Sequence, residues 1–370
     1  MRTPASRCCR LSLVFLLPLV LLVSTGIAAA SSEALLPEAV LFNQATSFGR
    51  SVAVSGGTAA VGVPGGGYVL IFQRNPGGAN PWVQVAQIAA DNSPQPGFGY
   101  DVALSGDLLV AGFFDPNFIS GSVYVFERNR GGTNAWGQLA RLTPSVPADA
   151  SRFGASVAIS GDTVVIGSGR FSPPAVSQAA YVFKRNQGGA DHWGEVRRLT
   201  PADPADLFGS SVAIHGDRVV VGAPWDDDQA YHTGAAYIFE RNQGGTEQWG
   251  QVRKLTASNA SGSQHFGTEV GISGGTIVVG TDAGFALIFE RDQGGAGSWG
   301  EVRRLISTLG GVTFGDLVAI DGDRVLVGSR DAFGEFRGEA ASDGRDVHPD
   351  LLEDLAGHLA PHSATTRLTG

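Results

Sequence analysis

Cysteine and lysine are almost absent from this chain of 370 residues. The two cysteines, Cys8 and Cys9, stand close to the start, and the only lysines are Lys184 and Lys254. Disulfides, cysteine-bound zinc and thiolate catalysis are therefore excluded for the rest of the chain. Its fold must depend on buried apolar surface, for which a chain of this length is sufficient.

Runs of basic residues are also absent, and the formal net charge is −9. We therefore expect no nucleic-acid partner. The sequence has no His-Glu-x-x-His and no Gly-Lys-Ser/Thr motif. We therefore expect that the protein is not an enzyme. Carboxylates drawn from separate repeats would, however, leave no linear motif.

The first residues have the pattern of an export signal. Arg2, Arg7 and Arg10 are followed by an apolar stretch, 11–23, and by three alanines at 28–30. We expect cleavage after residue 30, which leaves no membrane span and a secreted or cell-surface chain. An uncleaved anchor is the alternative.

A Phe-Gly pair opens each of six similar units. In the fourth unit a short strand, 211–214, is followed by a glycine turn and a valine-rich strand, 218–222. A third strand, 237–239, leads through a Gly-Gly loop to Trp249 and a fourth strand ending at Leu255. The Phe-Gly pairs begin at Phe48, Phe98, Phe153, Phe208, Phe266 and Phe314.

Four short strands cannot bury both faces of their sheet alone, but units stacked around an axis can. The sequence therefore predicts an all-β fold, a β-propeller of four-stranded blades, over residues 31–333. We expect six blades, with seven as the alternative. The N-terminal strand at 39–42 is predicted to close the last blade, whose third strand is missing or degenerate near 335–341. Residues 334–370 are predicted to form a divergent tail, disordered or containing a short helix.

Phe208-Gly209, Val221-Gly222-Ala223-Pro224 and Gly234-Ala235-Ala236-Tyr237 spell the FG-GAP repeat. The chain resembles bacterial-style secreted FG-GAP proteins and the N-terminal β-propeller of integrin α subunits, over residues 40–333. The resemblance implies cell adhesion, a seven-bladed ring in integrins, and calcium bound between the second and third strands of a unit. It also implies that calcium hairpins and the ligand surface lie on opposite faces.

The acidic loop of the fourth unit is the candidate calcium site. Asp226 and Asp228 alternate as calcium ligands do, with Asp227 adjacent, but no further carboxylate follows before Gly234. Calcium prefers six to eight oxygen ligands. A solvated acidic turn is the alternative interpretation.

Aromatic residues fall into two groups. The tryptophan that precedes each complete fourth strand is expected in the core, since its place is fixed. The long loops after the second strands are predicted to form one partner-binding patch. The loops before Phe-Gly, at 144–152 and 201–207, are the rival surface. The patch comprises Phe113, Phe114, Phe118, Phe171, Trp225 and Tyr231.

These features predict an exported, non-catalytic binding or adhesion module for an extracellular protein or polysaccharide surface. The alternative is an extracellular carbohydrate-active hydrolase or lyase with a site in the propeller channel. Two carboxylates within about 10 Å of each other above a channel pocket would favour it.

Overall fold

The computed structural model describes residues 21–23, 39–41, 47–75, 82–114, 121–169, 178–203, 205–306, 313–330 and 336–342. Within these ranges the chain consists of β-strands, joined by turns and two short 3-10 helices, η1 (Ala90–Asn92) and η2 (Pro147–Arg152). The all-β prediction is confirmed. No helix in the described part of the chain is long and apolar enough to cross a membrane.

Five sheets have four strands each and follow one another along the chain. Each is an antiparallel meander in sequence order, with a shift of register between its third and fourth strands. The first sheet is β3 (Val52–Ser55), β4 (Thr58–Val63), β5 (Tyr68–Arg74) and β6 (Trp82–Ile88). The second is β7 (Phe98–Ser105), β8 (Leu108–Phe113), β9 (Ser122–Arg128) and β10 (Trp136–Leu142). The third is β11 (Ser156–Ser160), β12 (Thr163–Gly167), β13 (Ala180–Arg185) and β14 (Trp193–Leu199). The fourth is β15 (Val212–His215), β16 (Arg218–Ala223), β17 (Ala235–Arg241) and β18 (Trp249–Leu255). The fifth is β19 (Val270–Ser273), β20 (Thr276–Gly280), β21 (Phe285–Arg291) and β22 (Trp299–Ile306).

A sixth sheet has three described strands, β23 (Thr313–Asp321), β24 (Arg324–Arg330) and β25 (Phe336–Ser342). β25 pairs with β24 along its whole length. The third strand expected to be missing or degenerate is therefore present, inside the segment predicted as a divergent tail. Phe336–Ser342 lacks the Tyr-Val-Phe pattern of the other third strands, so of the two expectations, missing or degenerate, the second agrees with the structure.

The N-terminal strand does not pair as predicted. β2 (Ala39–Leu41) forms a two-stranded antiparallel sheet with β1 (Leu21–Val23). Among the described strands, the sixth sheet ends at β25 and receives no partner from the N-terminus. Three residues pair equally well with any exposed strand edge, so length and apolarity alone did not specify the partner.

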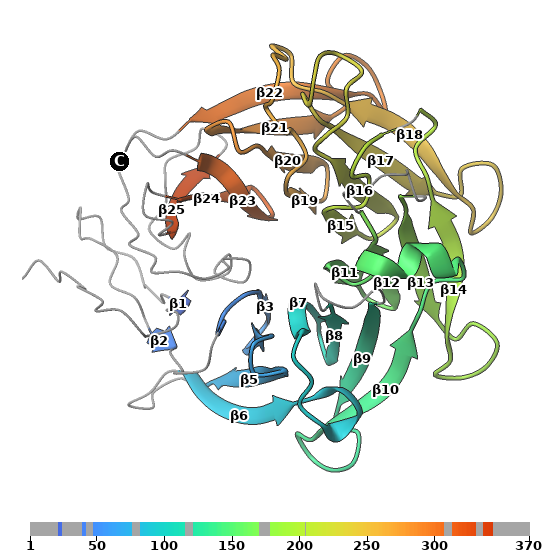
Figure 1. Ribbon diagram of the computed structural model, residues 1–370, viewed down its shortest axis with the longest axis vertical. Coiled ribbons are helices and arrows are strands. Elements are labelled where there is room, and N and C mark those ends of the chain that lie inside the picture. The colour runs from blue at the N-terminus through green and yellow to red at the C-terminus, as the bar shows by residue number, and fades with distance from the viewer. Residues whose placement is uncertain are drawn as a thin grey trace, which may run out of the picture.

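The sheets are arranged around a common centre (Figure 1). The first strand of each of the six sheets lies innermost, and the fourth strand of each four-stranded sheet lies at the rim. Neighbouring inner strands contact one another from β3 through to β23. The core lies between sheets: Val110 and Val125 of the second pack with Phe153, Val164 and Tyr181 of the third.

Because successive strands run in opposite directions, every second loop lies on the same face of the ring. The loop after each second strand and the loop before the next Phe-Gly lie at the same end of the strands. Backbone hydrogen bonds join them: His265 N–H donates to the His232 carbonyl at 3.1 Å, and Gly121 N–H to that of Ala150 at 2.5 Å. The two surfaces expected to be rivals thus form one face, here called the loop face.

Candidate functional site

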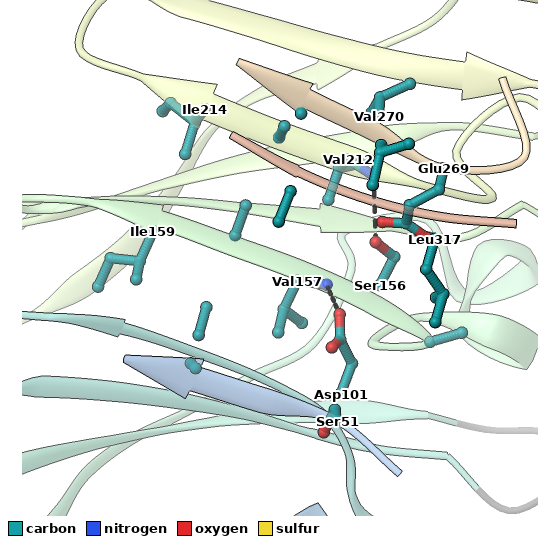
Figure 2. A pocket seen from close by; sticks show the side chains of 18 of the residues that line it. Ser51, Asp101, Ser156, Val157, Ile159, Val212, Ile214, Glu269, Val270 and Leu317 are labelled. Carbon is teal, nitrogen blue, oxygen red and sulfur yellow. Dashed lines mark hydrogen bonds between the residues drawn. The ribbon is translucent and has the colours of Figure 1, made fainter. Parts of the chain in front are cut away.

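The inner strands line a central pocket of about 310 Å³ that extends from the loop face to near their other ends. Inner strands begin at this face, directly after the Phe-Gly pairs, so the second residue after each pair stands near the channel mouth. Among the pocket-lining residues, Asp101 and Glu269 carry this position in the second and fifth sheets. Figure 2 shows both pointing into the pocket from opposite sides. The six residues at this position are Ser51, Asp101, Ser156, Ser211, Glu269 and Leu317.

Asp101 is held by backbone hydrogen bonds. Its carboxylate accepts from Val102 N–H at 2.9 Å and from Val157 N–H of the next sheet at 2.7 Å. In the same way, the Ser156 hydroxyl of the third sheet accepts a hydrogen bond from the Val212 N–H of the fourth sheet at 3.1 Å (Figure 2). Burial raises the pKa of Asp101 to about 6, opposed by these hydrogen bonds and by Arg50.

Glu269 faces the same pocket without such support. No group in the described part of the chain donates a hydrogen bond to its carboxyl. Burial, and then the negative charge of Asp101, raise the pKa of Glu269 to about 8, opposed by Arg50. At neutral pH the Glu269 carboxyl is therefore mostly protonated and can donate a hydrogen bond.

Two arginines flank the carboxyls at the mouth. The guanidinium of Arg50 lies 4.4 Å from the ring centroid of Tyr100 and donates to its hydroxyl at 2.8 Å. The guanidinium of Arg152 lies 5.2 Å from the ring centroid of Phe114, and its buried Nε has no hydrogen-bond partner in the structure as described. Phe114 packs edge-on against Tyr100 at 4.9 Å.

Four of the six residues expected in the partner-binding patch either pack against neighbouring sheets or lie outside the described residues. Phe114 is 8% exposed, beneath Arg152, and Phe113 packs between the first and second sheets. Because both rings pack inward beside the channel, their expected role as partner contacts stays a prediction. Phe118 and Phe171 lie outside the described residues.

Trp225 and Tyr231 do lie together on the loop face. The ring of His232 stacks on Tyr231 at 3.8 Å and on Trp225 at 4.2 Å. His265, from the loop before Phe266, lies 6.0 Å from Trp225 and its Nδ1 is 2.7 Å from an Asp282 oxygen. Tyr231 is 67% exposed, so the stack presents one open aromatic face to solvent. We call Trp225, Tyr231, His232 and His265 the aromatic stack.

The candidate calcium carboxylates are engaged with a lysine. Asp226 is buried, and both its oxygens accept from Lys254 Nζ at 2.9 Å. It also accepts from the Tyr237 hydroxyl at 2.7 Å, and Lys254 bridges to Asp228. Asp227 accepts from His232 N–H at 2.5 Å. Calcium here stays a prediction, and the ion would have to displace Lys254.

A similar acid, tyrosine and base group recurs in the third sheet. There Asp149 is buried and accepts from Tyr181 and, at 2.8 Å, from Arg198. The recurrence indicates a role in joining loop to sheet.

The tryptophans before the fourth strands have a structural place too. Four of them are buried, which confirms core packing for these four: Trp82, Trp193, Trp249 and Trp299. Trp136 is half-buried.

Repeated antiparallel sheets set around a channel define a β-propeller. The chain belongs to the FG-GAP repeat family, since that repeat matches residues 82–126, 136–183, 193–239 and 249–297. No curated protein matches the sequence significantly.

Among solved structures, the fold is similar to the periplasmic gluconolactonase PpgL of Pseudomonas aeruginosa. The TM-score is 0.54 at 15% identity, over 86% of this chain and 93% of that one. The β-propeller domain of Cps50 (Swd1) from Myceliophteria thermophila has a TM-score of 0.48 at 14% identity, over 77% of this chain and 80% of its own. At such identities the likeness extends to the fold alone.

The channel carboxyls were not found from the sequence. Asp101 and Glu269 belong to different repeats, so no motif contains both. A signal was nevertheless available: aligning the repeats on Phe-Gly puts a carboxylate at the same inward position in the second and fifth units.

Proposed function

We propose that the chain is an exported, non-catalytic binding protein that holds an extracellular polysaccharide on its loop face. The observation that carries this proposal is the open ring of Tyr231 at the end of the aromatic stack. Among the described phenylalanine, tyrosine and tryptophan side chains, it is the one that is more exposed than buried. Aromatic rings with one apolar face and one polar edge suit surfaces that are partly wet.

The stack is also preorganised. Ring contacts at 3.8 and 4.2 Å fix Tyr231 against His232 and Trp225, and the Ser263 N–H donates to the Tyr231 carbonyl at 2.8 Å. A side chain that is already ordered loses less conformational entropy when it binds. A sugar ring laid on Tyr231 would therefore meet a rigid platform.

Co-sedimentation with insoluble cellulose, chitin and peptidoglycan tests this function. We expect the exported chain to sediment with at least one of them and to stay in solution without it. Binding to none, with capture of a purified extracellular protein instead, would contradict the polysaccharide proposal. N-terminal sequencing of the exported chain tests the predicted cleavage after residue 30.

A second candidate function is an extracellular carbohydrate-active hydrolase with its site in the channel. Asp101 and Glu269 face one pocket with pKa values of about 6 and 8, which suits a base and an acid at neutral pH. PpgL, whose fold is similar, is a periplasmic gluconolactonase. Turnover of chromogenic glycosides or sugar lactones that Glu269→Gln abolishes would favour the enzyme. No turnover of these substrates by the wild type would exclude it for them.

For the ring itself we propose six blades, one for each of the six units that a Phe-Gly pair opens, with seven as the alternative. Six described sheets each begin at such a pair. The alternative draws on the sheet of β1 and β2, which Figure 1 shows in the sector between the sixth and first sheets. A crystal structure of the exported chain, from which cleavage would remove β1, distinguishes the two.

A further inference from the structure

We propose that the mouth of the central channel is a second binding site, for a small organic anion that also carries hydroxyl groups, such as a sugar acid. The site is separate from the aromatic stack, and it requires neither the proposed polysaccharide binding nor turnover in the channel.

The first observation is a pair of permanent cations at the mouth. Arg50 follows the first Phe-Gly pair and Arg152 precedes the third, so both stand where inner strands begin, and both line the pocket. Each guanidinium lies over an aromatic ring. No ion pair joins either arginine to a carboxylate in the described residues. A guanidinium with unused N–H groups is well suited to a carboxylate.

The second observation is the charge of the pocket as a whole. Its titratable lining groups are Arg50, Tyr100, Asp101, Arg152 and Glu269. With Asp101 ionised and Glu269 protonated at neutral pH, positive charge exceeds negative. Asp316, which precedes the lining residue Leu317 on β23, does not itself line the pocket. The pocket therefore favours an anion over a cation or a neutral molecule.

The third observation concerns hydrogen bonds. The protonated Glu269 carboxyl is a donor with an unused acceptor oxygen, and Arg152 Nε is a buried donor with no described partner. Buried polar groups left without partners cost free energy, which a ligand with hydroxyl groups recovers. A pocket of about 310 Å³ is of the size that small ligands occupy.

Titration calorimetry with D-glucuronate, D-glucose and acetate tests the site. D-glucose is the neutral counterpart of D-glucuronate, and acetate is an anion without hydroxyl groups. We expect the exported chain to bind D-glucuronate at pH 7 about tenfold more tightly than either. Equal affinity for D-glucuronate and D-glucose would overturn the proposal.

The wild type also provides a pH test. Raising the pH from 7 to 9 ionises Glu269 and places a negative charge in the pocket, so D-glucuronate should bind at least about threefold more weakly. Glu269→Gln should lose this weakening, so that its own affinity for D-glucuronate is the same at pH 7 and pH 9. A wild-type affinity that does not change between pH 7 and 9 contradicts the proposal.

Arg152→Gln should reduce D-glucuronate affinity about tenfold, because it removes one of the two cations at the mouth. The matched control is Arg253→Gln on the exposed side of β18, which should bind like the wild type. Unchanged D-glucuronate affinity in a folded Arg152→Gln protein would overturn the assignment. The pH profile of the wild type decides the matter if that variant does not fold.

Discussion

Gly222 and Gly267 meet where the fourth and fifth sheets pack together, so closely that a Cβ on Gly222 would lie 2.1 Å from the carbonyl oxygen of Gly267. Gly267 belongs to a Phe-Gly pair and has a φ of +96°, a conformation that other residues adopt at a cost. A Cβ on Gly167 would meet Gly209 in the same way, at 2.2 Å, between the third and fourth sheets. The glycines of the repeat thus set the spacing between sheets.

Gly222→Ala should therefore lower the free energy of unfolding by about 2–4 kcal/mol, because backbone cannot move aside as a flexible side chain can. Chemical denaturation of the exported chain measures the change. The control is Gly275→Ala in the β19–β20 turn, where a Cβ would have no neighbour nearer than 3.8 Å. That variant should stay within about 0.5 kcal/mol of the wild type. Equal losses in both would contradict the packing argument.

These glycines explain why so much of the fold could be predicted from the sequence. A Phe-Gly pair that recurs at a regular interval marks a position where a Phe is fully buried and two backbones approach closely. Every sheet needs both features. A strand of only three residues contains no comparable signal of which strand it pairs with. That is why Ala39–Leu41 was expected to join the last sheet, whereas it pairs with Leu21–Val23.

The stability of the protein should fall as the pH rises through the range set by the channel carboxyls. The pKa of Glu269 is raised from 4.5 to about 8 and that of Asp101 from 3.8 to about 6. Between these limits the folded chain holds protons that the unfolded chain has released, so higher pH favours unfolding. Melting temperatures from pH 5 to 9 measure the effect.

Glu269→Gln should reduce this pH dependence from about pH 5 to about pH 8, because glutamine does not titrate. The control is Asp323→Asn, at the exposed tip of the β23–β24 turn, which should follow the wild-type profile. A Glu269→Gln profile parallel to the wild type would show that Glu269 is not held protonated in the channel.

Lys254 should compete with calcium at the acidic loop. Its ammonium contacts both Asp226 and Asp228, so a divalent ion must displace it to reach these carboxylates. We expect 5 mM calcium, about the concentration needed to detect a millimolar site, to shift the melting temperature of Lys254→Ala more than that of the wild type. A larger shift in the wild type would contradict this competition.

Without calcium, Lys254→Ala should itself cost about 3–5 kcal/mol, since it leaves the buried Asp226 carboxylate without its cation. Arg253→Ala, on the exposed side of the same strand, should cost less than about 0.5 kcal/mol. Equal stability of the two variants would show that the pair with Asp226 contributes little. Denaturant unfolding at pH 7 supplies both values.

The candidate sites were only partly predictable, for a physical reason. Trp225 and Tyr231 are close in sequence and lie together, whereas Phe113 and Phe114 turn inward against neighbouring sheets. Exposure of a loop aromatic depends on what the next sheet places beside it, and one repeat's sequence does not contain that information. The same holds for Asp101 and Glu269, which only the ring brings into one pocket.

The most direct test of the account is the affinity of Tyr231→Ala for the polysaccharide that the wild type sediments with. Loss of the open ring should raise the dissociation constant about tenfold or more. Val302→Ala, at another exposed apolar position on the outer strand β22, should leave it unchanged. A Tyr231→Ala protein that is folded and binds as tightly as the wild type would contradict polysaccharide binding through the loop face.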